Sequence, residues 1–302
     1  MKKLLLILLC VPLIGFGQLT YVPDNWFEAY LENNGMGNGI QYDDSVFTAS
    51  IDTVTYLDLS YGAGQAIGIF DLTGIEDFSS LTYLDISYNL LATVDLSQNI
   101  LLTELYCSDN QLSSLDLSSN INLQYLYCST QNISTLILPN SNTLLELSFG
   151  FNYVTSIDLS MYTNLIYLDC AYNGITDLDL SNNSSLTSLI AQEGSLHNLD
   201  LRNGNNYNMI EMLCFGNDNL TCINVDDSVW STNNWTVTNG DIDTQQYFSV
   251  NCSQPTSVEE YNLTRELFKV TDLLGRETKG KKNEPLFYIY DDGTVEKRIV
   301  IE

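Results

Sequence analysis

Positive charge is nearly absent from most of this sequence. The chain carries 11 Lys and Arg against 38 Asp and Glu, a formal net charge of −27, and no basic residue lies between Gln18 and Asp200. Eight of the 11 basic residues lie from Arg265 onward. Proteins bind nucleic acids largely through Lys and Arg contacts with phosphate, so the charge excludes nucleic acid as a partner. An anionic membrane surface would also repel this chain.

Catalytic signatures are missing as well. The sequence has one histidine, His197, which we interpret as a solvated loop residue. It contains no C-x-x-C, H-E-x-x-H or phosphate-binding glycine motif. Carboxylates occur throughout, so no particular pair stands out as general acid and base. We therefore expect a protein that is not an enzyme and has no cofactor.

Hydrophobic runs long enough to matter for targeting occur only at the N-terminal end. Residues 1–18, MKKLLLILLCVPLIGFGQ, combine two lysines, an apolar run and small residues before Gln18. This order is typical of a secretory signal peptide, and the run is too short to span a bilayer. We expect an exported mature chain without a transmembrane span.

A 21-residue repeat fills the middle of the chain. Apolar residues follow the first leucine of each repeat at +3, +5, +10, +13 and +15, and Asn or Gln stands at +8 in all but one. The repeats start at Leu81, Leu102, Leu123, Leu144, Leu165 and Leu186. After an insertion near NGNNYN, a further repeat is expected at Ile210, Leu213, Phe215, Leu220, Ile223 and Val225; an irregular one precedes the array at Val54, Leu57 and Leu59.

The phrase from Leu102 to Leu112 matches L-x-x-L-x-L-x-x-N-x-L, so residues 51–226 resemble the leucine-rich repeat family. Alternating apolar residues independently predict a short strand with one buried face. One 21-residue unit cannot bury that face alone, so neighbours must stack into a solenoid. We predict a mostly β fold, an open parallel-stranded leucine-rich repeat superhelix. The second half of each repeat should form a short strand or extended segment on the opposite side, not a helix.

Three cysteines stand at the +5 position: Cys107, Cys128 and Cys170. Other repeats have isoleucine, phenylalanine or alanine there, so we interpret the cysteines as core residues. Cysteines on neighbouring parallel strands point their Cβ atoms side by side, which does not favour a disulfide. The Asn and Gln residues at +8 are expected to hydrogen-bond the backbone where each strand turns.

Both ends of a solenoid need a cap. Residues 19–50 should form the first, with a short helix that Asp24 caps and that buries Phe27, Tyr30 and Leu31. Residues 227–252 resemble the C-terminal cap of secreted bacterial leucine-rich repeat proteins, with Trp230, Trp235 and Phe248 covering the last repeat. We expect Cys222 and Cys252, which bracket this segment, to form a disulfide in an oxidising compartment.

The C-terminal tail differs from the rest in composition. Residues 253–264 are polar and are expected to be a linker, and alternation in residues 265–302 predicts a small antiparallel β module. This module resembles the sorting domain of the type IX secretion system at its DLLGRE turn, its Gly/Lys-rich middle and its terminal KRIVIE strand. The resemblance implies that the secretion machinery is a partner, that the chain crosses the inner and outer membranes, and that it is then released or attached to the cell surface.

Residues beside the buried strand positions should form an aromatic and acidic concave face. High strand propensity is one explanation for the tyrosines; the other is a recognition face for an extracellular protein or a glycan. The candidates are Tyr83, Asp85, Tyr88, Glu104, Tyr106, Tyr125, Tyr127, Glu146, Phe151, Tyr167, Asp169 and Tyr172.

Aspartates also recur in the second half of the repeat. Neighbouring like charges repel, so Ca²⁺ bridging them is one hypothesis and a hydrated acidic face is the alternative. The residues are Asp95, Asp116, Asp158, Asp179 and Asp200, with Ile137 interrupting the series. The sequence thus favours a non-enzymatic exported binding protein; a carbohydrate-binding accessory protein and a structural adhesin without a ligand pocket are the alternatives.

Overall fold

The structure is a computed structural model that describes residues 17–60, 68–252, 267–272, 276–278, 285–290 and 295–299. The chain divides into two compact units, Met1–Cys252 and Ser253–Glu302. Residues 1–16 of the expected signal peptide and the whole expected linker, residues 253–264, lie outside the described residues.

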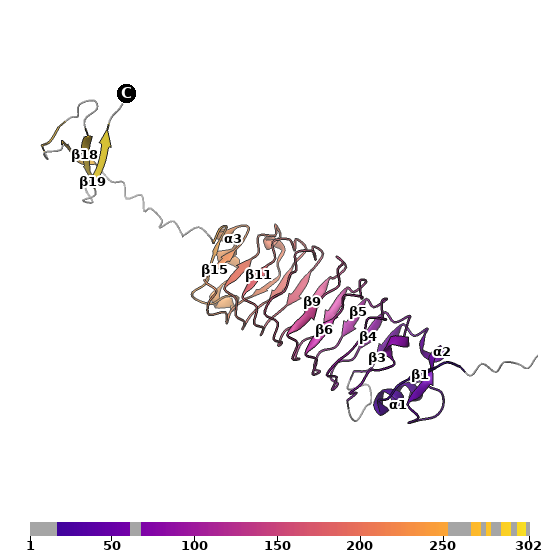
Figure 1. Ribbon diagram of the computed structural model, residues 1–302. Coiled ribbons are helices and arrows are strands. Elements are labelled where there is room, and N and C mark those ends of the chain that lie inside the picture. The colour runs from indigo at the N-terminus through magenta and orange to yellow at the C-terminus, as the bar shows by residue number, and fades with distance from the viewer. Residues whose placement is uncertain are drawn as a thin grey trace, which may run out of the picture. The chain divides into compact units, whose positions relative to one another are not determined.

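The first unit is a solenoid of parallel strands, as the repeat predicts (Figure 1). Each repeat contributes one three-residue strand to an eight-stranded sheet in the order β14-β12-β10-β9-β7-β5-β4-β3. Equivalent positions of neighbouring repeats pair directly, for example Leu105 with Leu126. The strands are β3 (Tyr56–Asp58), β4 (Tyr83–Asp85), β5 (Glu104–Tyr106), β7 (Tyr125–Tyr127), β9 (Glu146–Ser148), β10 (Tyr167–Asp169), β12 (Ser188–Ile190) and β14 (Glu211–Leu213).

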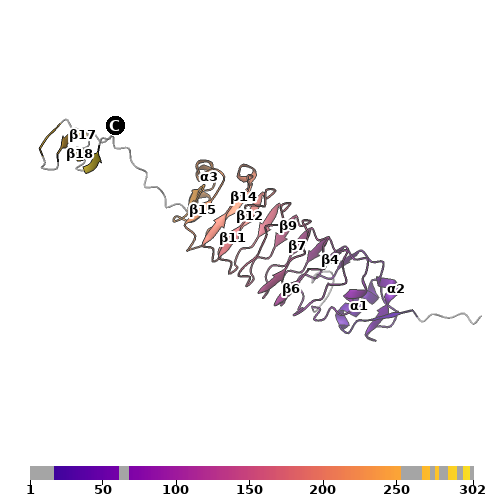
Figure 2. The same ribbon diagram turned by 45° about the horizontal axis from the view of Figure 1, so that its top comes forward.

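The second half of the repeat forms shorter sheets on the opposite side of the solenoid, and most of its segments are strands, as expected (Figure 2). β6 pairs with β8, and a four-stranded sheet has the order β11-β13-β15-β16. These strands are β6 (Ser114–Asp116), β8 (Thr135–Ile137), β11 (Asp177–Asp179), β13 (Asn198–Asp200), β15 (Cys222–Asn224) and β16 (Tyr247–Ser249). Single turns of 3-10 helix lie at η1 (Ile75–Asp77), η2 (Asn206–Asn208) and η3 (Val237–Asn239).

The core runs between the two sides and contains the cysteines. Cys107, Cys128 and Cys170 are buried, as is Cys214, which sequence analysis did not place there. Burial raises the pKa of the Cys170 and Cys214 thiols well above the usual value, so these groups stay protonated and apolar. The cysteines act as packing residues, which confirms the interpretation from their position.

Two asparagine ladders satisfy the backbone inside the turns. In the expected ladder at +8, the Asn110 side chain donates to Ile86 O (2.9 Å) and Cys107 O (3.0 Å) and accepts from Leu91 N–H (3.0 Å). A second ladder, which sequence analysis missed, lies at +18 and consists of Asn99, Asn120 and Asn183, all fully buried. Each donates to two carbonyls of the preceding repeat. Buried backbone groups need such partners, so both ladders are structural.

One expected register is wrong by a single residue. The last full repeat starts at Met209, which is 8% exposed, whereas Ile210 is 86% exposed. Met212 and Cys214 are the buried strand positions, in place of the expected Leu213 and Phe215. The η2 turn lengthens the preceding repeat by two residues, not three, since Met209 follows Leu186 by 23 residues and Ile210 by 24.

The N-terminal cap has the expected helix. The strands β1 (Leu19–Tyr21) and β2 (Ser45–Phe47) pair antiparallel beside the helices α1 (Asn25–Asn33) and α2 (Thr48–Ile51). Asp24 Oδ1 accepts from Trp26 N–H (2.8 Å) and Phe27 N–H (3.0 Å), which caps α1. Asp24 Oδ2 also accepts from Phe70 N–H (2.8 Å), so this carboxylate ties the cap to the first repeat.

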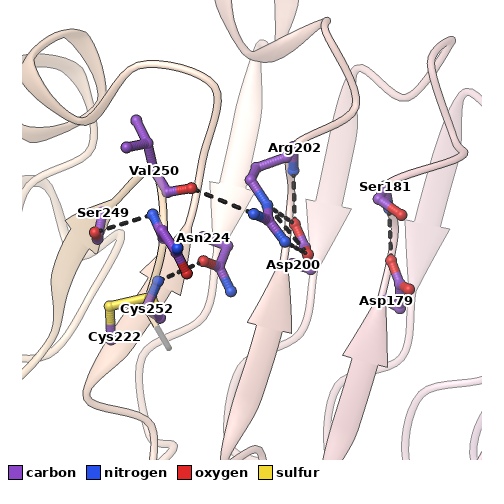
Figure 3. Close-up of polar contacts among 10 residues, drawn as sticks. Asp179, Ser181, Asp200, Arg202, Cys222, Asn224, Ser249, Val250 and Cys252 are labelled. Atoms are coloured by element: carbon purple, nitrogen blue, oxygen red, sulfur yellow. Dashed lines mark hydrogen bonds and ion pairs between the residues drawn. A yellow bond between two sulfur atoms is a disulfide. The ribbon is translucent and has the colours of Figure 1, made fainter. Parts of the chain in front are cut away.

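The C-terminal cap contains α3 (Ser228–Asn234) and β16, which adds parallel to β15. Trp230 and Trp235 contact each other edge to face, with ring centroids 5.4 Å apart, and Trp235 packs on Phe248. Cys222 and Cys252 form the expected disulfide (Figure 3). Asn224 Oδ1 accepts from Cys252 N–H (2.8 Å), so a hydrogen bond and a covalent bond both fix the end of the unit.

The second unit contains the expected small antiparallel sheet. Its strands are β17 (Leu267–Thr271), β18 (Pro285–Tyr290) and β19 (Val295–Ile299), with β18 in the centre. Nowhere in the described ranges of the chain is a helix long and apolar enough to cross a bilayer.

Candidate functional site: the eight-stranded face

The eight-stranded sheet presents two outward positions on each strand, the first and the third. The residues at the first position alternate between Tyr and Glu from β4 to β10: Tyr83, Glu104, Tyr125, Glu146 and Tyr167. The third positions of β4, β5, β7 and β10 carry Asp85, Tyr106, Tyr127 and Asp169. The structure therefore brings these nine of the 12 predicted residues onto one surface, the eight-stranded face.

Four tyrosines on this face stack on one another across neighbouring repeats, and we call them the strand row: Tyr56, Tyr83, Tyr106 and Tyr127. The ring centroids of Tyr56 and Tyr83 lie 4.3 Å apart, and those of Tyr106 and Tyr127 lie 5.1 Å apart. Tyr83 and Tyr106 join the two pairs with a tilted contact of 5.4 Å. Sequence analysis missed Tyr56, although its place between the apolar residues Val54 and Leu57 of the irregular repeat was the signal for it.

The carboxylates beside the strand row receive hydrogen bonds from their neighbours. The Tyr127 hydroxyl donates to Glu146, and the Tyr106 hydroxyl donates to Glu104 (3.4 Å). Burial and the adjacent carboxylates raise the pKa of the Tyr106 and Tyr127 phenols. These phenols therefore stay protonated and donate hydrogen bonds to carboxylates on a face that carries no Lys or Arg.

A second polar chain crosses the middle of the face. The hydroxyl oxygens of Ser129 and Ser148 lie 2.9 Å apart, and the Ser148 hydroxyl donates to Asp169 Oδ2 (3.0 Å). Ala171 N–H donates to Asp169 Oδ1 (3.1 Å). Burial raises the pKa of the Asp169 carboxyl, and these hydrogen bonds oppose the increase. The polar groups of the strands are thus largely satisfied within the chain.

The turn that follows each strand of the eight-stranded sheet from β4 to β14 has a left-handed residue at +7. We call this set the turn row: Tyr88, Asp109, Thr130, Phe151, Tyr172, Glu193 and Gly216. The six non-glycine members have φ between 51° and 58°, and Gly216 has φ 71°. Each N–H of these six donates to a carbonyl of the next repeat, as Phe151 N–H does to Ala171 O (2.9 Å). The repeat therefore imposes this backbone conformation, which suits Gly, Asn and Asp and disfavours bulky residues.

The three predicted residues that are not on strands are the aromatic members of the turn row. Tyr88 is 59% exposed, Phe151 54% and Tyr172 40%. The Phe151 and Tyr172 rings stack with centroids 4.0 Å apart and an angle of 13° between their planes. Neither burial nor backbone preference accounts for aromatic side chains here. Sequence analysis included them without recognising that they form a separate row, and it missed Asp109 and Glu193 between and beside them.

The predicted aspartate series lies on the opposite side of the solenoid. Asp95, Asp116, Asp158 and Asp179 each accept from the backbone N–H of the serine two residues later, at 2.9 Å. These hydrogen bonds hold the pKa of the Asp95, Asp116 and Asp158 carboxyls below the usual value. The carboxylates thus have a local structural role as turn caps.

Arg202 ends the aspartate series by replacing the serine (Figure 3). Its guanidinium forms an ion pair with Asp200 (2.5 Å) and donates to Val250 O (3.3 Å). In residues 17–60 and 68–252, no three His, Cys, Asp or Glu side chains are arranged to hold a metal ion. Ca²⁺ bridging of neighbouring aspartates stays a hypothesis. His197 is exposed, with Nδ1 2.9 Å from Ser195 O.

Comparisons with known proteins agree with the fold. No protein-family model and no curated protein sequence matches the chain. Among solved structures, internalin C2 of Listeria monocytogenes is similar with a TM-score of 0.56 and 21% identity, over 72% of this chain and 95% of that one. A leucine-rich repeat protein of Leptospira interrogans is similar with a TM-score of 0.50 and 21% identity, over 58% of this chain and 46% of that one.

The functional domain of InlJ from Listeria monocytogenes, which includes a cysteine ladder, has a TM-score of 0.48 and 28% identity, over 69% of this chain. The present chain covers about half of that domain, 52%. The solenoid therefore has the fold of leucine-rich repeat proteins such as internalin C2.

Proposed function

We propose that the protein is an exported, non-enzymatic leucine-rich repeat protein that binds an extracellular protein through the eight-stranded face and the aromatic members of its turn row, Tyr88, Phe151 and Tyr172. The observation that carries the proposal is the exposed aromatic set Tyr88, Phe151 and Tyr172 at backbone positions that disfavour aromatic residues. Exposed aromatic side chains of this kind supply most of the binding energy in many interfaces.

Export is supported by separate observations. The first 18 residues have the pattern of a signal peptide, and the Cys222–Cys252 disulfide suits an oxidising compartment. The sheet formed by β17, β18 and β19 is compatible with a sorting domain of the type IX secretion system, whose machinery would be a further partner. We propose that the mature chain resides at the bacterial cell surface or outside the cell.

A pull-down with the full mature chain tests the function. We expect the chain to capture a protein from surface extracts and the double variant Phe151→Gly/Tyr172→Gly to lose it. Glycine fits φ values of 55° and 53°, so this variant should fold. Thr130→Gly, in the same row but without an aromatic ring, is the matched control and should bind normally.

Four outcomes would contradict parts of the proposal. Capture that survives the double variant would remove the turn row from the binding surface. Binding only to a glycan array would replace the protein partner with a carbohydrate. In cell fractionation, a full-length chain recovered only inside the cell would contradict export. A chain truncated before residue 265 that still reaches the outside would contradict the role of the tail.

A further inference from the structure

The turn row contains two aromatic residues that are each followed, one repeat later, by a carboxylate. Tyr88 precedes Asp109, and Tyr172 precedes Glu193. Tyr88 N–H donates to Ser108 O (3.0 Å) and Tyr172 N–H donates to Gln192 O (3.1 Å), so the members of each pair lie on hydrogen-bonded neighbouring turns. All four have φ between 51° and 58°. Their side chains therefore leave the backbone in the same direction.

The carboxylates of these pairs differ from those on the strands. Glu104 and Glu146 receive hydrogen bonds from tyrosine hydroxyls, and Glu211 receives one from the Ser188 hydroxyl (2.6 Å). Within residues 17–60 and 68–252, no side chain donates a hydrogen bond to Asp109 or Glu193 and no basic group pairs with either. Their charges are thus available to a partner.

The charge of the first unit restricts what that partner can be. Arg202 is the one basic residue between Gln18 and Cys252, and its guanidinium is paired with Asp200 on the opposite side of the solenoid. The eight-stranded face and the turn row therefore carry negative charge alone. Complementary charge is what selects and steers a partner to such a surface.

We propose that the partner presents two cationic side chains, Arg or Lys, one for each pair. This inference rests on the proposed function and names the chemistry of its partner. A guanidinium can lie on the exposed ring and donate two hydrogen bonds to the carboxylate of the next repeat. Arginine suits this geometry better than lysine because its planar group both stacks and pairs. Phe151 packs behind Tyr172 at 4.0 Å and holds that ring in place.

The repeat also sets the spacing of the two cations. Tyr88 and Tyr172 are separated by four repeats of 21 residues, since 172 minus 88 is 84. At ~4.8 Å per strand the two pairs lie ~19 Å apart. An extended peptide rises ~3.3 Å per residue, so basic residues roughly six positions apart match both pairs.

Synthetic peptides test this inference with the full mature chain. The probe has two arginines separated by five Gly/Ser residues. One comparison peptide has a single residue between the arginines, and the other has citrulline in place of arginine. In calorimetric titration we expect the first peptide to bind about tenfold more tightly than either comparison, the size of one lost cation–π and ion-pair contact. Tyr172→Gly and Glu193→Gln should each lower its affinity by about the same factor.

Two control variants separate this surface from general attraction to an acidic protein. Asp116→Asn removes a carboxylate on the opposite side, and Thr130→Gly changes the turn row without removing a ring or a charge. Both should leave the affinity within about twofold. Equal losses for Asp116→Asn and Glu193→Gln, or equal binding of the citrulline peptide, would overturn the inference. Competition by a neutral oligosaccharide would also overturn it, in favour of a glycan ligand.

The proposed function can survive failure of this inference. A natural partner that depends on Phe151 and Tyr172, together with no binding of the arginine peptide, would overturn the cationic chemistry alone. If no partner depends on Phe151 and Tyr172 and the arginine peptide does not bind, both proposals are overturned.

Discussion

The strand row and the turn row run along the same solenoid and contain similar residues, yet their surroundings differ. In the strand row, Tyr106 and Tyr127 stack at 5.1 Å, and their hydroxyls donate to Glu104 and Glu146. In the turn row, Phe151 is half exposed, occupies a left-handed position and is stacked only on Tyr172.

This difference separates two explanations for an aromatic residue at a surface. The strand tyrosines gain from packing on a pleated surface and from cross-strand contacts, so stability accounts for them. The turn aromatics gain little from their surroundings and occupy a backbone conformation that costs ~1–2 kcal/mol for a residue with a Cβ atom. The fold explains the first row, whereas the second row supports the proposed recognition.

Removing a strand tyrosine should have the largest effect on stability. We expect Tyr127→Ala to lower the free energy of unfolding by ~2–3 kcal/mol, because it removes a ring stack and a hydrogen bond to a carboxylate. Urea unfolding followed by circular dichroism measures this. Tyr127→Phe is the control and should lose ~1 kcal/mol, since it keeps the ring and removes the hydroxyl. An unchanged unfolding midpoint in Tyr127→Ala would show that the strand row is dispensable for the fold. The two rows would then not differ in their contribution to stability.

Replacing a turn aromatic should change stability much less. Phe151→Gly loses the stack on Tyr172 and gains backbone relief, so the free energy of unfolding should change by less than ~1 kcal/mol. Thr130→Gly removes a β-branched residue at φ 57° without losing a stack and should stabilise the chain by ~1 kcal/mol. The same urea experiments apply. If Phe151→Gly lowers the free energy of unfolding by ~2 kcal/mol or more, which is typical of losing a buried structural group, the ring is structural.

The fold was largely predictable because the repeat fixes it many times over. The spacing from Leu81 to Leu186 places every buried apolar strand residue in that array, and the +8 asparagines follow from it. The register slipped at Ile210 because two apolar residues stand side by side after an insertion. Asn217 held the missing information: its amide donates to Ala191 O (2.9 Å) and Cys214 O (2.8 Å), so it must occupy the +8 position of a repeat that starts at Met209.

The sequence placed the candidate residues beside the buried strand positions, but it did not separate them into two rows. A left-handed turn is normally signalled by Gly, Asn or Asp, and of the seven turn-row positions only Asp109 and Gly216 show that signal. The diagonal contact between Tyr83 and Tyr106 depends on side-chain directions that periodicity does not contain. The +18 ladder was also hidden, because three of the six regular repeats have another residue there: Ser141, Tyr162 and Gly204. Tyr162 donates to Pro139 O (2.8 Å) instead.

Alkaline pH should weaken the solenoid through the partly buried phenols of its strands. Burial and the neighbouring Asp169 raise the pKa of Tyr167 to about 12, whereas an unfolded tyrosine titrates near ~10. Between these values the unfolded state binds fewer protons, so the free energy of unfolding must fall as pH rises. Below pH ~10 both states keep the proton and this contribution is constant.

Urea unfolding midpoints measured between roughly pH 9 and 11 give the slope of stability against pH, because this range begins below the pKa of an unfolded tyrosine and extends above it. Tyr167→Phe keeps the ring and removes the titrating hydroxyl, so its midpoint should fall less steeply than that of the wild-type chain. Burial and the Glu146 carboxylate raise the pKa of Tyr127 in the same direction, so Tyr127→Phe should flatten the profile as well. Identical slopes for both variants and the wild-type chain would mean that the strand phenols are as accessible to solvent as in the unfolded chain. The packing of the strand tyrosines would then not change their titration.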